Sequence, residues 1–154
     1  QWEYAARGGL DGKEYAWGDA LTPAGKYMAN TWQGVFPLVD TGDDGHTGRA
    51  PVGCYAPNGY GVFDMIGNVW EWTADPYYPA HAIDDATRDG APNGLDPRQP
   101  DVPVGVIKGG SYLCAADYCA RYRPAARHAQ DTGLGTNHIG FRTVSRAETG
   151  TPPR

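Results

Sequence analysis

Long aliphatic stretches are missing from this chain. Only 22 of its 154 residues are Leu, Ile, Val or Phe, and no apolar run approaches the roughly 18–20 residues that a membrane helix needs, so no membrane segment is expected. Cysteine is also scarce. Three cysteines do not form a disulfide framework, and their odd number points to a reducing compartment or to thiols with a chemical role.

Glycine, proline and aromatic residues take the place of the aliphatics. Twenty-two Gly and 13 Pro exclude a helix bundle, because both residues are unfavourable inside helices. A net charge of only −5, with five Trp, ten Tyr and three Phe, argues against disorder. This acidic balance does not suit nucleic acids, whose binding rests on Lys and Arg contacts with phosphate. We expect one loop-rich globular domain, or a piece of one, with an aromatic core.

Regular structure is predicted in a few short segments. Residues 2–7 have the pattern of a helix end that is stopped by a Gly-Gly pair, and residues 68–73 alternate as a strand does. Further strands are expected over residues 104–113 and 139–144. The fold class is therefore α+β with little regular structure. Irregular loops of such length are usually functional or held by ions.

Cys114 and Cys119 are the most specific candidates for chemistry. Five positions apart, they can meet only if the chain turns between them. Two thiolates brought together would form a soft ligand pair for copper(I) or zinc, or a disulfide, although a buried inert thiol is the commoner fate of a free Cys. The third cysteine, Cys54, has no evident partner. Five Arg against one acidic residue in 121–146 would favour thiolates nearby.

Two acidic segments are candidates for hard cations. Residues 40–46 and 64–71 combine carboxylates with glycine, as calcium loops do, but neither has the EF-hand pattern. Solvated loops with Asx-turns are an equally simple interpretation. Trp70, beside Glu71, indicates either a stacking platform or core packing. Ser111 is not part of a G-x-S-x-G motif, which argues against a serine hydrolase.

Four motifs together resemble the formylglycine-generating enzymes, also called sulfatase-modifying factors. They are WEYAARGG, PNGYGVFDMIGNVWEWT, KGGSYLC-x4-CARYR and NHIGFR, and the resemblance runs from Trp2 to Val144. It implies that residues 1–146 are the C-terminal part of one domain, which would need an N-terminal half as its partner, and that 147–154 form a tail. The implied fold is mixed α+β, distantly related to C-type lectin-like domains.

The resemblance also implies an activity. Enzymes of this family use O2 to convert a cysteine in a C-x-P-x-R motif of an unfolded sulfatase polypeptide to Cα-formylglycine. By motif match, Cys114 and Cys119 would bind copper(I) and leave room for the substrate thiolate. Ser111 and Tyr118 would line the active site, and Trp70 would support substrate binding.

Structural calcium is implied as well. The first site would use the side chains of Asn30 and Asp44 with the carbonyls of Thr31 and His46. The second would use the side chains of Asp64 and Glu71 with the carbonyls of Gly67 and Val69.

Two departures from the family pattern indicate the type of organism and the compartment in which the protein would act. Secreted members carry cysteines where this chain has Ala6 and Pro124, so we expect a bacterial cytoplasmic enzyme. The alternatives are a thiol–disulfide redox protein that uses Cys114 and Cys119, and a non-catalytic, calcium-stabilised binding module of the same superfamily. A sulfoxide synthase ranks last, because that branch needs a histidine cluster for iron.

Overall fold

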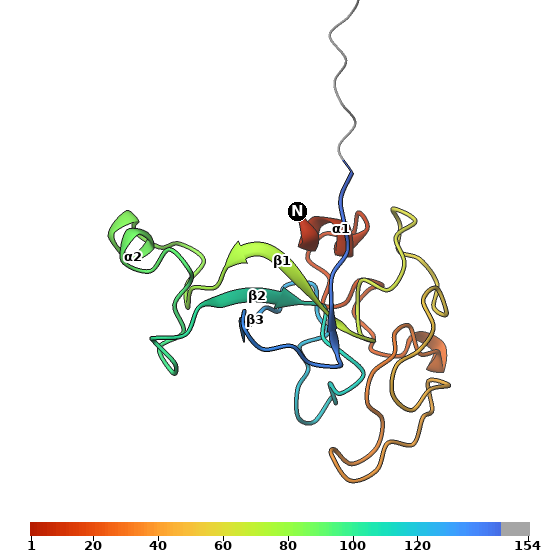
Figure 1. Cartoon of the computed structure of the whole chain (residues 1–154). Coiled ribbons are helices and arrows are strands. Elements are labelled where there is room, and N and C mark those ends of the chain that lie inside the picture. Colours follow the sequence, from red (N-terminus) through yellow and green to blue (C-terminus); the bar gives the residue numbers. More distant parts are fainter. Residues whose placement is uncertain (146–154) are drawn as a thin grey trace, which may run out of the picture.

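The computed structural model describes residues 1–145, so the predicted tail at 147–154 lies outside the described residues. Its regular elements are few and short (Figure 1). They are α1 (Trp2–Arg7), a 3-10 turn (Pro23–Gly25), β1 (Trp70–Pro76), α2 (Asp85–Gly90), β2 (Val104–Lys108), β3 (His128–Asp131) and β4 (Ile139–Gly140). Neither α1 nor α2, each of six residues, could span a bilayer. The predicted α+β class with little regular structure is confirmed.

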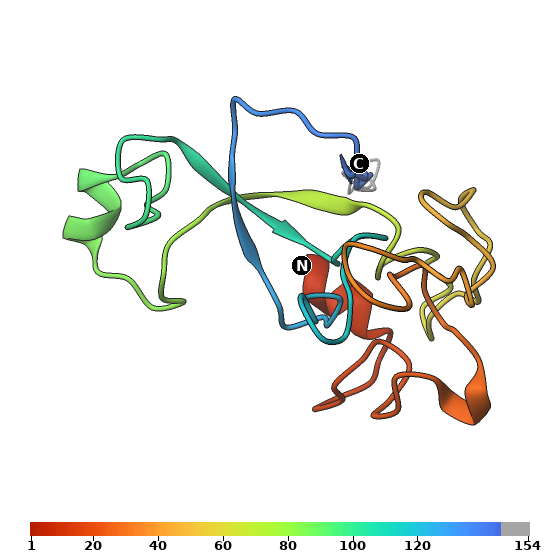
Figure 2. The same ribbon diagram turned by 90° about the horizontal axis from the view of Figure 1, so that it is seen from below.

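A single four-stranded sheet forms the centre of the molecule. Its strand order is β3-β2-β1-β4, with β2 antiparallel to both neighbours and β1 parallel to β4. All five residues of β2 are buried, which agrees with their apolar sequence VGVIK. Figures 1 and 2 show α2 at one end of the sheet and the irregular loops of residues 10–69 at the other.

The bounds of the strands differ from those that the sequence pattern predicts. The predicted strand over 104–113 ends at Lys108, because Gly109 and Gly110 adopt φ values of 91° and 73°, outside the extended region. The predicted strand over 68–73 begins only at Trp70, since Asn68 also has a positive φ, and it continues beyond the predicted end to Pro76. Of the segment 139–144, only the first two residues pair with β1.

Helix α1 forms where the sequence predicts it and is fastened to the sheet. Gly8 ends the helix in the left-handed conformation, and its N–H donates to the carbonyl of Ala5. From the first turn of the helix, Trp2 Nε1 donates to Glu71 Oε2 at 2.7 Å, and Glu3 forms an ion pair of 3.3 Å with Lys108. These contacts tie α1 to β1 and β2, because Glu71 and Lys108 face each other in the strand register.

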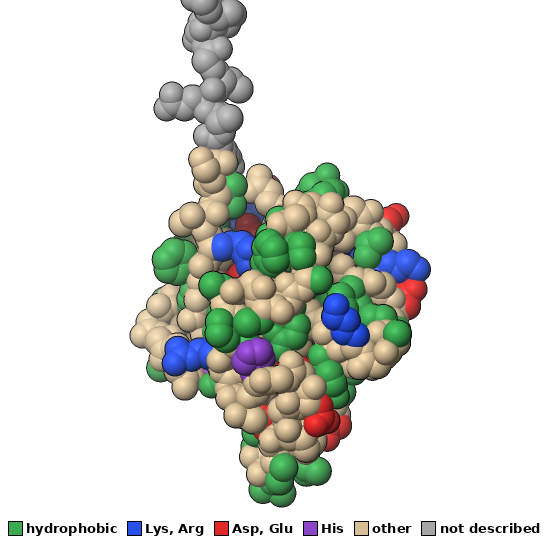
Figure 3. Space-filling model, turned by 90° about the vertical axis from the view of Figure 1, so that its right-hand side faces the viewer, with side chains coloured by type: hydrophobic (Ala, Val, Ile, Leu, Met, Phe, Trp, Pro, Cys, Tyr) green, Lys and Arg blue, Asp and Glu red, His purple; other side chains and the backbone are tan. Residues whose placement is uncertain are grey.

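The core is small, and it combines aromatic side chains with alanine, aliphatic and sulfur-containing ones. Its buried cluster packs side chains of β1 and β2 against those of the loops, and it includes Met65, Trp70, Ile107, Cys114 and Tyr122. Beyond the core, apolar side chains remain at the surface, as the space-filling view shows (Figure 3). Several of these side chains are largely exposed to solvent: the exposed fraction is 79% for Leu38 and 87% for Val52. An exposed apolar surface of this kind commonly marks a contact with another chain or segment.

Candidate functional site

The two predicted cysteines meet on a tight turn that follows β2. Hydrogen bonds from Cys114 N–H to Ser111 and from Cys119 N–H to Ala115, of 2.9 and 2.8 Å, fold the chain back between them. The two sulfurs come to lie 3.2 Å apart, and both are free thiols. The turn that their spacing required is therefore present.

The two thiols differ in burial and in acidity. Cys114 is buried, whereas Cys119 is partly exposed. The Cys114 S–H donates to the Cys119 sulfur, and this bond, assisted by the charge of Arg121, lowers the pKa of Cys119 to about 6 despite partial burial. The same bond, together with burial, raises the pKa of Cys114. Near neutral pH the pair holds one proton and one negative charge, which suits a soft monovalent cation.

Ser111, Tyr118 and Trp70 have different positions around the pair. Ser111 is fully buried, and its Oγ accepts the N–H of Leu113 at 3.2 Å, which supports the turn. Tyr118 is 73% exposed beside Cys119 in sequence. Trp70 is buried in the core and stacks on His128, which agrees with the core-packing interpretation, and its part in substrate binding stays a prediction.

Three of the four residues that were predicted as ligands of the first calcium site are directly connected. The backbone N–H of Thr31 donates to Asp44 Oδ2 at 2.9 Å, and that of His46 donates to Asp44 Oδ1 at 3.0 Å. The Gln33 amide contacts both Asp44 Oδ2 and the carbonyl of Thr31, so these two oxygens converge on one partly positive group. A cation would find the same two oxygens within reach.

Asn30, the fourth predicted ligand, supplies an independent indication. Its side chain is buried, and its Nδ2 donates to the carbonyl of Gly48 and to Asn68 Oδ1. Its Oδ1 is buried and has no hydrogen-bond partner among residues 1–145. A buried acceptor without a partner is costly unless something satisfies it, and an oxygen-binding cation next to Thr31 and Asp44 would do so. The donor set of the first site therefore fits calcium.

The second predicted calcium site already contains a positive group. The Arg142 guanidinium donates to both Glu71 oxygens at 2.6 Å and also to the carbonyl of Asp64. Asp64 Oδ2 accepts the N–H of Gly53 at 2.6 Å. A calcium ion here would share Glu71 with Arg142, so the fit is weaker than at the first site.

In the sequence, Gly67 and Val69 lie between Asp64 and Glu71, in the segment that leads into β1. Gly67 has φ of 74°, and the Cβ of any larger residue would collide with the carbonyl of Asn30, so the position requires glycine. Its N–H donates to the carbonyl of Gly109 at 2.8 Å. This bond links the second acidic segment to the end of β2, from which the cysteine turn begins.

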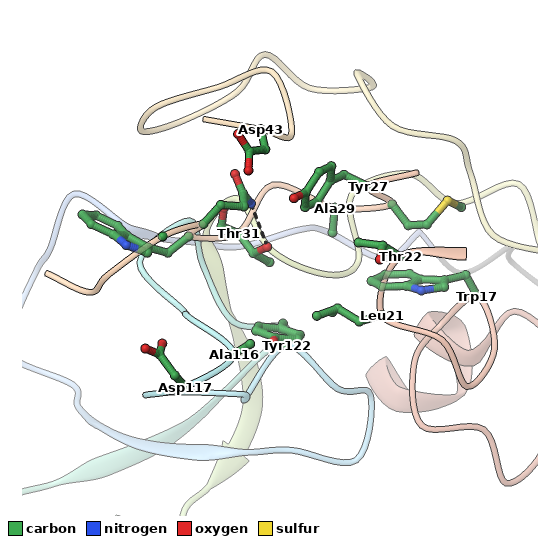
Figure 4. Close-up of a pocket in the computed structure, with 14 residues that line it drawn as sticks. Trp17, Leu21, Thr22, Tyr27, Ala29, Thr31, Asp43, Ala116, Asp117 and Tyr122 are labelled. Atoms are coloured by element: carbon green, nitrogen blue, oxygen red, sulfur yellow. Dashed lines mark hydrogen bonds between the residues drawn. The ribbon is translucent and has the colours of Figure 1, made fainter. Parts of the chain in front are cut away.

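A cavity of about 340 Å³ opens beside the cysteine turn (Figure 4). Asp117 from the turn and Asp43 from the facing loop lie on different sides of it, and Trp17, Tyr27 and Tyr122 contribute aromatic surface to its lining. Its volume suits part of a peptide or a small ligand. No sequence motif indicated this cavity, because its walls come from two segments that are far apart along the chain.

No group of three or more His, Cys, Asp or Glu side chains that could hold a metal occurs within residues 1–145. The predicted metal positions instead consist of a cysteine pair and of carboxylates combined with amide and backbone oxygens.

A model of the sulfatase-modifying factor enzyme 1-like domain matches residues 1–147. The chain belongs to this family. A formylglycine-generating enzyme from Thermomonospora curvata is 51% identical over 94% of the chain, and one from Mycobacterium tuberculosis is 52% identical over the same share. The chain spans about half the length of these relatives, 47% and 48%. A mouse relative named inactive Cα-formylglycine-generating enzyme 2 is 38% identical over 96% of the chain, so membership alone does not establish activity.

Solved structures show the same fold. PvdO from Pseudomonas aeruginosa is 26% identical, with a TM-score of 0.54 over 91% of this chain and 48% of that one. Treponema denticola variable protein 1 has a TM-score of 0.59 at 24% identity, covering 91% of this chain and 43% of that one. At 24% identity, the match to Treponema denticola variable protein 1 supports the fold alone.

Proposed function

We propose that this chain carries the catalytic cysteine pair of a copper-dependent oxidase. The oxidase would use O2 to convert a cysteine in a C-x-P-x-R motif of an unfolded sulfatase polypeptide to Cα-formylglycine. The observation that carries this proposal is the convergence of the Cys114 and Cys119 sulfurs at 3.2 Å on one turn. About 50% identity to proteins named formylglycine-generating enzymes supports it.

In this proposal the two cysteines hold the metal and the turn holds the cysteines. Copper(I), when bound, would supply a soft centre that accepts thiolates and reacts with O2. Cys119, the more acidic and more exposed thiol, provides the negative charge on the side that is open to a substrate. Ser111 keeps the turn closed from inside, and Tyr118 offers an exposed ring at the entrance.

The electron balance of the proposed reaction requires a reductant. Replacing one C–H and the C–S bond of the substrate cysteine by C=O removes two electrons from the β-carbon and releases hydrogen sulfide. O2 accepts four electrons, and the net oxygen-containing products are the aldehyde and one water. The remaining two electrons, with two protons, must come from an external thiol, which is oxidised to a disulfide.

Calcium and a second chain segment complete the proposal. We assign structural Ca²⁺ to the first site, where Asn30 Oδ1 lacks a partner, and less firmly to the second, where Arg142 shares Glu71. The exposed apolar side chains and the half-length match support the predicted need for an N-terminal half as partner. The whole activity therefore belongs to the two parts together.

The test combines copper binding with turnover. The purified protein should bind one copper(I), which a chromophoric chelator would report, and, when combined with its N-terminal half, should convert a C-x-P-x-R peptide aerobically in the presence of a thiol. The product shows the mass of an aldehyde and forms a hydrazone. Cys114→Ala and Cys119→Ala should lose both properties, whereas Cys54→Ala, which removes an exposed thiol elsewhere, should keep them. Full turnover in either active-site variant would refute the assignment.

A thiol–disulfide redox protein is the second candidate. The low pKa of Cys119 and its contact with Cys114 are features of redox-active pairs as well. Such a protein would exchange disulfides with a small thiol after all copper has been removed, and would leave the mass of the peptide unchanged.

A further inference from the structure

Three aromatic side chains pack in series against the outer side of the cysteine turn. The ring of Tyr118, which belongs to the turn, stacks on Phe36 with centroids 4.6 Å apart and an interplanar angle of 17°. Phe36 in turn meets Trp32 edge-on at 5.1 Å and 76°. Trp32, Phe36 and Tyr118, here called the aromatic clamp, thus join the loop after Asn30 to the segment between the two cysteines.

The backbone of the same loop is bonded to the turn. The N–H of Trp32 donates to the carbonyl of Cys114 at 3.1 Å, and Trp32 forms a parallel bridge with Ala115. One end of the turn is therefore fixed by a hydrogen bond at Cys114. The other end, near Cys119, is contacted from this loop through the ring of Tyr118.

The clamp is itself anchored at the first acidic segment. Gln33 lies between Trp32 and Phe36, and its side chain exchanges hydrogen bonds with Asp44: Nε2 donates to Oδ2 at 3.0 Å, and Oε1 accepts the Asp44 N–H at 3.2 Å. The N–H of Thr41 donates to the carbonyl of Gln33 at 2.9 Å. These bonds hold the loop that carries Phe36 while leaving the Phe36 ring free to pack on the turn.

The solvent exposure of Tyr118 shows why its contact with Phe36 matters. Tyr118 is 73% exposed, so the face that Phe36 covers supplies much of the packing that holds this side chain. An aromatic pair of this kind stabilises its partners beyond the effect of its buried area, and short surface turns open at little cost in free energy, so the contact can bias the turn.

We propose that Phe36, supported by Trp32, is a positioning residue that keeps the 114–119 turn closed so that the Cys114 and Cys119 sulfurs face each other. Phe36 acts through Tyr118, on whose ring it stacks. This inference deepens the proposed function: Phe36 would matter for catalysis only if the cysteine pair is catalytic. The geometric effect on the cysteine pair can be measured whether or not the protein is an oxidase.

The test measures how readily the two thiols join. In a buffer of reduced and oxidised glutathione without copper, the protein dithiol and one glutathione disulfide give the protein disulfide and two glutathione thiols. The equilibrium constant of this exchange reports the effective concentration of one sulfur at the other. Phe36→Ala should lower it by about threefold to tenfold, in proportion to the lost stacking energy. Phe36→Tyr retains a ring and should stay within about twofold of the original.

Two further measurements separate positioning from general stability. Tyr60→Ala removes another aromatic contact near the surface, the tilted Tyr4–Tyr60 pair with centroids 5.4 Å apart, and should lower the urea midpoint while leaving the exchange constant unchanged. Copper(I) affinity in chelator competition should fall in Phe36→Ala in parallel with the exchange constant. If Phe36→Ala is folded by circular dichroism and shows an unaltered exchange constant, the positioning role is refuted. If the constant falls but neither the unchanged protein nor any variant forms an aldehyde product in the presence of the N-terminal half, the role stands and the oxidase proposal fails.

Discussion

At the scale of single residues, the difference between the two cysteines matters most. Cys114 belongs to the buried core, and Cys119 lies at its edge near Arg121. Charge on a thiol is penalised by burial and favoured by a hydrogen-bond donor and a nearby cation. The donor for Cys119 is the S–H of Cys114, so each thiol sets the acidity of the other.

This asymmetry predicts the pH dependence of alkylation. Iodoacetamide reacts with thiolates, so alkylation of Cys119 should rise with pH and reach half its maximal rate near pH 6, the pKa of about 6 that the Cys114 bond causes. In Cys114→Ala the donor is lost, the pKa of Cys119 should rise toward the ordinary thiol range, and the midpoint should move up with it. Peptide mapping by mass spectrometry in a Cys54→Ala background locates the label. A midpoint that is the same with and without Cys114 would contradict the assigned hydrogen bond.

At the scale of elements, the Gly109-Gly110 pair decides where β2 ends and the cysteine turn begins. Both residues have positive φ, and Gly110 packs directly on the backbone of Tyr122. A longer strand would carry Ser111 and Cys114 away from the core instead of folding them back. Two glycines at the end of β2 therefore place the turn beside Tyr122.

The variant Gly110→Ala tests this close approach. The added Cβ would lie 2.9–3.0 Å from the Cα, Cβ and N of Tyr122, in addition to straining a φ of 73°. We expect a loss of about 2–3 kcal/mol in the free energy of unfolding, measured by urea denaturation. Gly12→Ala is the matched control: its φ is 63° and no atom lies within 4 Å of the added Cβ, so it should cost only about 1 kcal/mol. Equal losses in the two variants would mean that the contact with Tyr122 is not tight.

At the scale of the whole molecule, loops rather than regular elements occupy most of the chain, and polar side chains hold them. Asn68 shows how: its amide donates to the carbonyl of Ala50, and its Oδ1 accepts the N–H of Ala50 and one Asn30 amide hydrogen. A fold held in this way depends on a few buried polar groups, and one of them, Asn30 Oδ1, is unsatisfied. Bound calcium would therefore stabilise the assembly of loops as a whole.

Calcium should raise the thermal midpoint of unfolding. An ion that binds only the folded state at 100 times its dissociation constant contributes about 2.7 kcal/mol, so a rise of several degrees is expected on adding Ca²⁺ to chelator-treated protein. Asp44→Asn should abolish most of this increment, and Asp64→Asn should reduce it less, because Arg142 already neutralises Glu71. Asp89→Asn, an exposed acid elsewhere, should retain the full increment. An increment that Asp44→Asn leaves unchanged would exclude the first site.

Much of this organisation could be predicted from the sequence because its causes are local. A Gly-Gly pair stops α1 at Arg7, β-forming residues mark β1 and β2, and the motif around Cys114 marks the reactive turn. Strand ends were predicted less well, since they depend on positive φ values at Asn68 and Gly109 that apolar alternation does not reveal. The bacterial cytoplasmic setting and the calcium ligands stay predictions.

What the sequence by itself determined is the family, the α+β class and the identity of the two cysteines, because motifs and short-range propensities belong to contiguous residues. Only the tertiary structure decided that Phe36 packs on Tyr118, that Arg142 occupies the second acidic segment, and that a cavity opens between Asp43 and Asp117. Each of these depends on segments many residues apart. Such segments meet only when the aromatic core closes and the loops find their hydrogen-bond partners, and no local pattern records that outcome.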